Sequence, residues 1–158
     1  MPPKTSAGLL MYRQKNNELE FFIVHPGGPY WKNKDEQSWS IPKGEIEFSE
    51  QVLETAKREF KEETGIIPKE PFIPLGTAQL KSGKIIHAWA FEHDWSGLLM
   101  CQSFVEIEWP PHSKRMIKVP EVDRAGFFKE QEAKTKLNPA QNVFIDRLKS
   151  YLLQNNNA

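Results

Sequence analysis

Residues 44–66 read GEIEFSEQVLETAKREFKEETGI, and this stretch decides the fold because it specifies a helix with marked ends. Ser49 is a residue type favoured at the N-cap, where its hydroxyl can accept a hydrogen bond from the first turn. Gly65 can adopt the left-handed conformation that ends a helix. The sequence therefore predicts a helix over residues 49–64.

One face of this predicted helix is apolar. Its members recur at helical spacing and are Val52, Leu53, Ala56 and Phe60. Phe48 and Leu53 are also placed to form a hydrophobic staple across the N-terminus. An apolar stripe of this kind packs against other secondary structure, so we expect the helix to lie on a sheet.

Apolar segments before and after the helix predict the strands of that sheet. They cover residues 7–12, 21–25, 72–80, 84–93 and 103–109. Residues 26–38 are rich in glycine, proline and charge, which is typical of a surface loop. The expected fold class is α/β (α+β), with helices packed against one sheet.

A second helix is expected at the C-terminal end. Asn138 and Pro139 suit an N-cap and a first helical residue. The expected buried face comprises Val143, Phe144, Leu148, Tyr151 and Leu152. The tail QNNNA is expected to fray. We expect one domain over residues 1–158, with an ordered core at about 5–153.

Composition excludes several classes of protein. With 39% hydrophobic and 27% charged residues, the chain of 158 residues is not of the disordered class. The 21 basic residues balance 21 acidic residues, so binding of duplex nucleic acid by charge alone is not expected. Cys101 is the single cysteine, and no apolar run reaches the roughly 18 residues of a membrane span. We expect a cytoplasmic protein without a membrane partner, of undetermined oligomeric state.

Three glutamates of the predicted helix form an acidic cluster. Glu59, Glu62 and Glu63 are spaced i, i+3 and i+4, so their carboxylates share one surface. Each like-charged pair costs roughly 0.2–0.5 kcal/mol, and a hard divalent cation such as Mg²⁺ would remove that repulsion. The alternative interpretation is a solvated helix face on which Lys57 and Lys61 balance the glutamates.

The segment before the helix fits the same chemistry. Pro42 and Gly44 enclose Lys43 in a sharp turn that can present backbone carbonyls and an ammonium group to a metal–phosphate centre. Arg58 is placed to brace the neighbouring carboxylates, among them Glu50.

These residues resemble the signature of a known family. The matching positions are Gly44, Glu50, Arg58, Glu59, Phe60, Glu62, Glu63, Gly65 and Ile66. They follow the pattern G-x5-E-x7-R-E-U-x-E-E-x-G-U, where U is a bulky apolar residue, which resembles the Nudix hydrolases. The resemblance implies an α/β/α sandwich with a mixed sheet between helices. It also implies hydrolysis of a phosphoanhydride in a nucleoside diphosphate linked to another moiety, with Mg²⁺ as cofactor and Mn²⁺ as a possible substitute.

The resemblance also assigns the metal ligands. Glu59 and Glu63 are expected to be the principal ligands, and Glu62 a further ligand or the group that activates water. The backbone near Lys43 and Gly44 is expected to supply an additional oxygen ligand.

Further residues are expected to complete the catalytic site. Glu50 and Arg58 look like supporting residues. The segment Pro-Glu-Val-Asp at residues 120–123 resembles the part of related hydrolases that supplies another carboxylate, which makes Glu121 the expected additional ligand or base. Glu106 and Glu108 remain rivals for that role.

The expected substrate contacts are Tyr30, Trp31, Trp39, Lys43, Lys114 and Arg115. Tyr30 and Trp31 are large aromatic residues in a loop, so they either pack beneath it or stack on a base. Trp39 suits a core residue or a pocket wall. The basic loop that contains Lys114 and Arg115 either grips phosphate or is a solvated surface. His25, His87 and His93 have no zinc-ligand spacing and are expected to be structural.

The favoured substrate is diadenosine tetraphosphate or a related dinucleoside polyphosphate, because residues 39–44 and 120–123 resemble the hydrolases of those compounds. RNA 5′-ends, ADP-ribose, nucleoside triphosphates including oxidised ones, and inositol pyrophosphates remain alternatives. A nucleotide sensor without catalysis is a second hypothesis, which the intact glutamates oppose. An interaction protein is a third.

Overall fold

The computed structural model describes residues 4–156. Its strands are β1 (Thr5–Lys15), β2 (Glu18–Pro26), β3 (Lys43–Glu45), β4 (Ile73–Gln79), β5 (Ile85–Glu92), β6 (Phe104–Glu108), β7 (Met116–Pro120) and β8 (Val122–Lys129). Its helices are α1 (Val52–Thr64), α2 (Glu130–Lys136), the 3-10 helix η1 (Pro139–Gln141) and α3 (Asn142–Asn156). No helix within these residues is long and apolar enough to cross a membrane.

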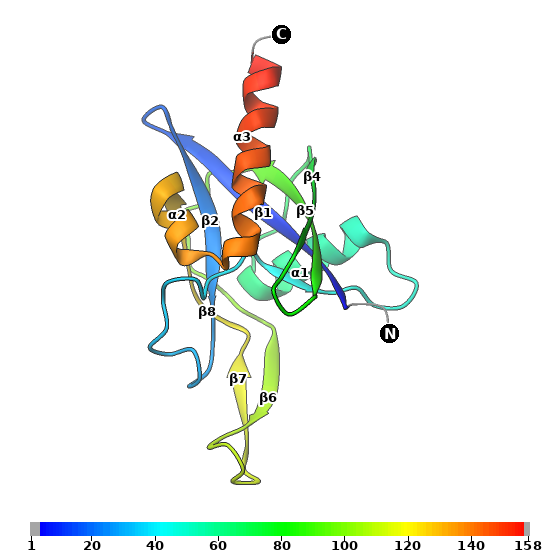
Figure 1. Cartoon of the computed structure of the whole chain (residues 1–158), viewed down its shortest axis with the longest axis vertical. Coiled ribbons are helices and arrows are strands. Elements are labelled where there is room, and N and C mark those ends of the chain that lie inside the picture. Colours follow the sequence, from blue (N-terminus) through cyan, green and yellow to red (C-terminus); the bar gives the residue numbers. More distant parts are fainter. Residues whose placement is uncertain (1–3, 157–158) are drawn as a thin grey trace.

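Six of these strands form one mixed sheet. The order is β4-β5-β1-β2-β8, and β3 pairs with the first part of β1. The central pair β1–β5 is parallel, whereas the pairs β1–β2, β1–β3, β2–β8 and β4–β5 are antiparallel. The sheet is therefore mixed, as expected for the fold class (Figure 1).

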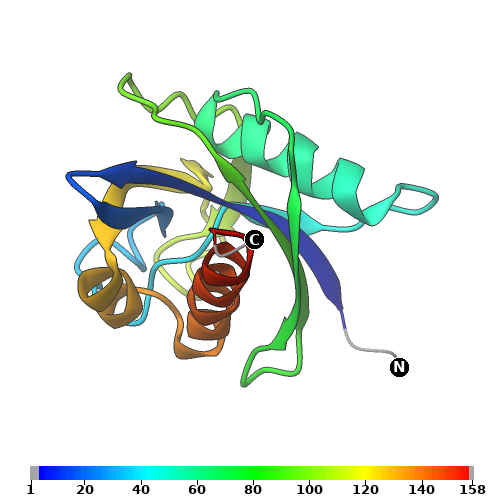
Figure 2. The same ribbon diagram turned by 90° about the horizontal axis from the view of Figure 1, so that it is seen from above.

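Helices cover both faces of this sheet. Seen from above, α1 lies on one side, and α2 and α3 lie on the other (Figure 2). The side chains of β1 alternate accordingly: Leu9 and Met11 join the core beneath α1, while Leu10 and Tyr12 join the core beneath α3. The three layers confirm the predicted α/β/α sandwich.

A hairpin of β6 and β7 stands apart from the main sheet. We call residues 104–120 the arm; it projects from the body of the molecule at the bottom of Figure 1. The strand predicted at 103–109 is confirmed, but it pairs with β7 and not with the central strands. The arm leaves several apolar side chains exposed, among them Phe104 and Met116.

The start of α1 differs from the prediction. The helix begins at Val52 with Gln51 at its N-cap, and Ser49 has a left-handed backbone with φ of 71°. Phe48 is fully exposed, so the staple with Leu53 is wrong. The physical reason lies in the neighbouring Glu50, whose side chain turns to partners within the helix. The helix ends as predicted, with Gly65 in the left-handed conformation.

The C-terminal helix follows its predicted cap. Asn138 caps η1 by accepting a hydrogen bond from the backbone N–H of Ala140 at 3.1 Å, and η1 leads into α3. Tyr151 was expected on the buried face but is 40% exposed, whereas Ile145 is fully buried. The helix extends to Asn156, so the first part of the tail is helical and not frayed. Residues 157–158 lie outside the described residues.

The corrected helix start gives a matched pair of substitutions. Phe60 is fully buried between the rings of Phe22 and Phe91, whereas Phe48 contacts solvent only. We expect Phe60→Ala to lower the free energy of unfolding by about 3–5 kcal/mol, and Phe48→Ala to change it by less than about 0.5 kcal/mol. Urea denaturation measures both. If Phe48→Ala lowered the free energy of unfolding as much as Phe60→Ala, the hydrophobic staple between Phe48 and Leu53 would be supported after all.

Candidate active site

Arg58 gathers the carboxylates along one edge of α1. Its Nε and Nη2 donate to the two oxygens of Glu50 at 2.8 and 3.0 Å, a bidentate pair. Its Nη1 donates to Glu59 at 3.0 Å and to Glu62 at 3.2 Å. The supporting role predicted for Arg58 and Glu50 therefore has a physical form: one guanidinium orients two of the three motif glutamates.

This network fixes the charge of its members. Hydrogen bonds from Arg58 and from the hydroxyl of Thr55 lower the pKa of Glu50 to about 2. The same contacts raise the pKa of Arg58, the largest cause being its bond to Glu50. Glu50 therefore stays ionised throughout the neutral range and pairs permanently with Arg58.

Gly44 lets β3 approach the helix. A Cβ atom at this position would overlap the carboxyl group of Glu59, so no other residue type fits without moving that side chain. Glu59 itself is 9% exposed. Burial raises the pKa of Glu59, with Glu62 and Glu121 adding to the shift and Arg58 opposing it. The glycine of the motif therefore sets the position of a predicted metal ligand.

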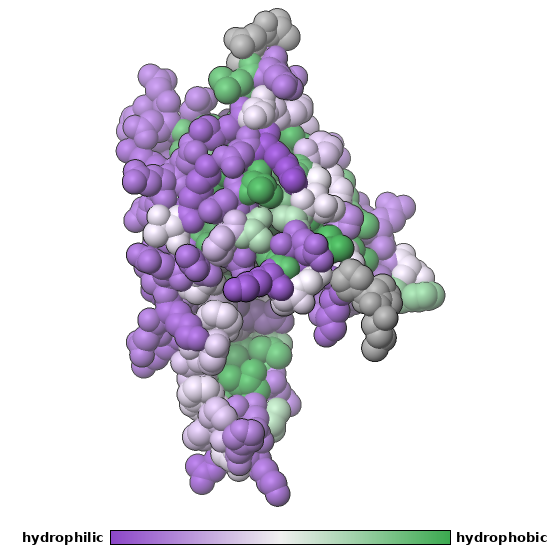
Figure 3. All heavy atoms as spheres, in the orientation of Figure 1, coloured by the Kyte–Doolittle hydropathy of each residue, from purple (hydrophilic) through white to green (hydrophobic). Residues whose placement is uncertain are grey.

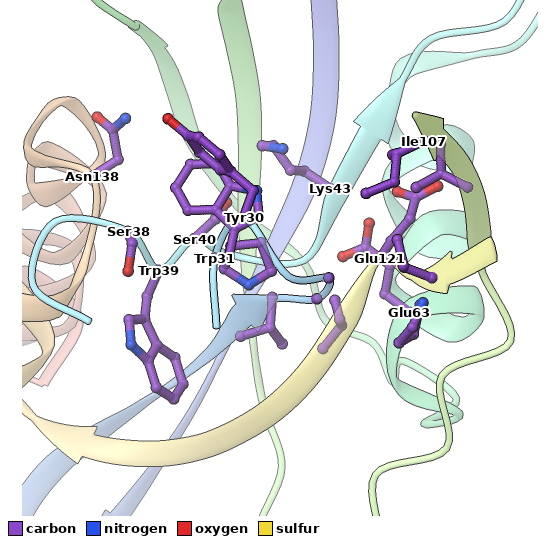
Figure 4. A pocket seen from close by; sticks show the side chains of 18 of the residues that line it. Tyr30, Trp31, Ser38, Trp39, Ser40, Lys43, Glu63, Ile107, Glu121 and Asn138 are labelled. Carbon is purple, nitrogen blue, oxygen red and sulfur yellow. The ribbon is translucent and has the colours of Figure 1, made fainter. Parts of the chain in front are cut away.

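A cavity of about 750 Å³ opens beside these carboxylates. Glu63, Glu121 and Lys43 line it, and Figure 4 shows them near one another together with Ile107. Glu63 is only 5% exposed, and burial together with repulsion from Glu121 and Glu59 raises its pKa to about 8, against the opposing effect of Lys43. The carboxylate predicted from residues 120–123 therefore lies close enough to act on the motif glutamates.

The donor set fits a hard divalent cation. Carboxylate oxygens are the ligands that Mg²⁺ and Mn²⁺ prefer, and the buried Glu59 and Glu63 repel Glu121 in the absence of a cation. As they stand, no three acidic, histidine or cysteine side chains within residues 4–156 converge closely enough to hold an ion. Arg58 bonds to Glu59 and Glu62, so these side chains would have to turn away from it to bind an ion.

The loop of residues 26–38 brings its aromatic residues to the same cavity. Tyr30 and Trp31 both line it and meet edge to face at 4.9 Å between ring centroids. Tyr30 is 54% exposed, so it is not packed beneath the loop. Trp39 also lines the cavity but is 4% exposed and donates a hydrogen bond to Asp35, which makes it a fixed wall.

His25 ties this loop to the strand that follows Glu121. Its ring is fully buried, with Nε2 2.6 Å from the carbonyl oxygen of Lys34 and Nδ1 2.8 Å from the carboxylate of Asp123. The backbone N–H of Gly27 also donates to the carbonyl of Glu121 at 3.1 Å. Sequence reasoning expected a structural histidine but missed these partners, because Asp123 is 98 positions away.

The other expected residues lie farther along the arm. Lys114 and Arg115 are exposed at its tip and are not among the described residues that line the cavity. Glu108 lines the cavity, yet its carboxylate accepts hydrogen bonds from the backbone N–H groups of His112 and Lys114 and so closes the tip. Glu106 lies opposite Lys118 in the hairpin.

Fold and site together define a class of protein: a mixed-sheet sandwich in which α1 carries a cluster of carboxylates at the side of a cavity that Glu63 and Glu121 line. The chain matches the family described as NUDIX domain over residues 2–148. It therefore belongs to the Nudix family, and it is a hydrolase of the class that cleaves phosphoanhydride bonds.

Solved structures share this fold. The Ap4A hydrolase of C. elegans, in a binary complex, is similar with a TM-score of 0.66 and 19% identity, over 96% of this chain and 98% of that one. The NUDIX domain of NrtR from Shewanella oneidensis, complexed with ADP ribose, has a TM-score of 0.65 and 13% identity, over 96% and 90%. The MutT protein from Methanosarcina mazei Go1 has a TM-score of 0.57 and 18% identity, over 95% of each chain. A search of the curated proteins gave no match.

The raised pKa of Glu63 predicts how stability changes with pH. The metal-free folded protein keeps a proton on Glu63 up to a pKa of about 8, whereas the unfolded chain loses it near 4.5. Stability therefore falls as pH rises through this window. At pH 8 and with chelator, we expect Glu63→Gln to be more stable than wild type by about 1–3 kcal/mol, and at pH 4 the two are expected to match. Urea unfolding measures this; equal stability at pH 8 would contradict it.

The close approach of Gly44 predicts a loss of metal affinity. Gly44→Ala removes space beside β3 that the Glu59 carboxylate needs if it is to turn from Arg58 toward an ion, so we expect Mn²⁺ to bind about 10–100-fold more weakly, measured by titration with electron paramagnetic resonance. Gly126→Ala is the control, because its Cβ would meet only the ring of Phe128, at 3.3 Å. Equal affinities in both variants would show that Glu59 does not bind the ion.

Proposed function

We propose that this protein is a metal-dependent pyrophosphohydrolase whose favoured substrate is diadenosine tetraphosphate or a related dinucleoside polyphosphate. One observation carries the proposal: a single cavity joins Glu63, Glu121 and Lys43 to the aromatic pair of the exposed Tyr30 and the half-buried Trp31. Carboxylates suit the metal–phosphate end of a nucleotide, and aromatic rings suit its base. The structural similarity to an Ap4A hydrolase supports the substrate, and the ADP-ribose complex of NrtR keeps ADP-ribose as the alternative.

The proposed roles of the chain's own residues follow from their positions. Glu59, Glu62 and Glu63, with Glu121 and a backbone oxygen near Lys43 and Gly44, would hold Mg²⁺, or Mn²⁺ in its place. Such ions neutralise charge on phosphate oxygens and lower the pKa of bound water. Glu62 or Glu121 would accept the proton of the water that attacks phosphorus in line.

Two groups of supporting residues complete this picture. Arg58 and Glu50 would keep the glutamates oriented, and the ammonium of Lys43 would pair with a substrate phosphate. Lys114 and Arg115 would reach only the part of a long substrate that extends toward the arm tip. The free thiol of Cys101 is consistent with a reducing, cytoplasmic setting, which we also propose.

The test is turnover of a substrate panel with Mg²⁺ and with chelator. The panel contains diadenosine tetraphosphate, ADP-ribose, a capped RNA end, ATP and 8-oxo-dGTP. We expect preferential cleavage of diadenosine tetraphosphate to ATP and AMP, separated by chromatography. We expect Glu59→Gln to lower kcat by about two orders of magnitude or more, since a neutral amide is a weaker ligand than a carboxylate for a hard divalent cation.

Glu54→Gln is the matched control for this test. Glu54 lies on the same helix, but its side chain is 58% exposed and pairs only with Lys57. Activity within twofold of wild type is expected. Preference for another compound would replace the substrate and keep the mechanism. Full activity of Glu59→Gln would contradict the mechanism, and binding without turnover of any compound would favour a sensor.

A further inference from the structure

The arm presents an apolar stripe to the cavity. Cross-strand pairing places Val105 opposite Val119 and Ile107 opposite Ile117, so these side chains share one face of the hairpin. Val105, Ile107 and Val119 line the cavity, and Trp109 lines it at the end of β6. Val105 is nevertheless 43% exposed. Ile107 and Trp109 are half-buried and Val119 is buried, so the fold leaves this stripe only partly covered. Figure 3 shows hydrophobic residues on the arm close to the body.

The stripe is continuous with the proposed catalytic carboxylates. Ile107 lies beside Glu121 and Glu63 in Figure 4, while Tyr30 and Trp31 lie across the cavity from them, with Lys43 between the two groups. The cavity thus offers two apolar surfaces separated by a charged centre. A cavity of about 750 Å³ is in the upper part of the range of about 300–1,000 Å³ for small-molecule sites.

The arm is fixed in place relative to the loop. Gly28 of the loop faces the side chain of Val119, where an added Cβ would be 3.3 Å away, and Gly27 lies directly against Pro120. These contacts, together with the two hydrogen bonds of His25, hold the arm and the loop of residues 26–38 at a set separation across the cavity. A pre-formed space between two apolar walls favours a flat, rigid ligand group over a flexible one.

We propose that the cavity-facing stripe of the arm, Val105, Ile107 and Trp109, binds the second aromatic base of a substrate that has one base at each end of a polyphosphate. The first base stacks on one of the rings of Tyr30 and Trp31, which lie at 85° to each other, and the phosphates pass over Lys43 and the glutamates. This assignment rests on the proposed function and names the element that selects two-base substrates over one-base substrates. Aromatic and aliphatic side chains bind bases mainly through apolar contact, which suits this stripe.

The experiment compares the two faces of the arm. Ile107→Ser removes apolar surface from the cavity face, and Met116→Ser removes it from the opposite face, where Met116 is 59% exposed and does not line the cavity. For diadenosine tetraphosphate, we expect Ile107→Ser to raise KM about tenfold with kcat within twofold, since a base contact is commonly worth this much. KM for a one-base substrate, ADP-ribose or ATP, is expected to stay within twofold. Met116→Ser is expected to match wild type for both.

Calorimetric binding of diadenosine tetraphosphate in chelator separates this inference from the proposed function. If wild type cleaves the compound and Ile107→Ser behaves like Met116→Ser, the arm assignment is overturned and the proposed function stands. If wild type binds the compound without cleaving it and only Ile107→Ser weakens this binding, the proposed function is overturned and the assignment of the second base to the arm is supported. Equal weakening of one-base and two-base ligands in Ile107→Ser overturns the second-base assignment, as does absence of binding and turnover in wild type.

Discussion

The site depends on one guanidinium. Arg58 is 30% exposed and pairs with Glu47 at 3.7 Å as well as with Glu50, Glu59 and Glu62, so a single positive charge stands among four negative ones. Its bidentate bond to Glu50 fixes the turn before α1, and its third nitrogen orients the helix glutamates. For Glu63, Lys43 is the positive charge that opposes the rise of the pKa caused by burial. The helix therefore carries two kinds of carboxylate: those already paired with arginine and one that is buried without an equivalent partner.

The parts of the fold that the sequence predicted correctly are those that local interactions determine. Gly65 ends α1 because a left-handed residue is required there, and the apolar stripe places Phe60 in the core whatever the rest of the chain does. The start of the same helix was wrong because the bonding of Glu50 to Thr55 and Arg58, five and eight residues away, decides the conformation of Ser49. A capping rule that considers only the first turn of the helix does not take these bonds of Glu50 into account.

The same distinction holds for the site. The motif glutamates were predictable because their spacing in one helix fixes their common surface. The cavity was not, because its walls come from the loop after β2, from the arm and from Asn138 near the last helix. The contact between His25 and Asp123 has no sequence signal, since each residue alone suits an ordinary buried or exposed role. The arm also escaped prediction: a strand pattern at 103–109 does not say whether it joins the central sheet or leaves it.

Burial of Glu63 would link folding to the ion binding that we propose. Burial raises its pKa to about 8, so near neutral pH the folded chain keeps a proton that a bound ion would displace. The ion that we propose to bind there would add to the partial compensation that Lys43 gives this carboxylate, and it would stabilise only the folded state, where the proposed ligands lie near one another. The cost of burying Glu63 near Glu59 and Glu121 would therefore be largest at alkaline pH without the ion. The same burial would favour a cation there, because buried carboxylates whose charge is only partly balanced gain most from an added positive charge.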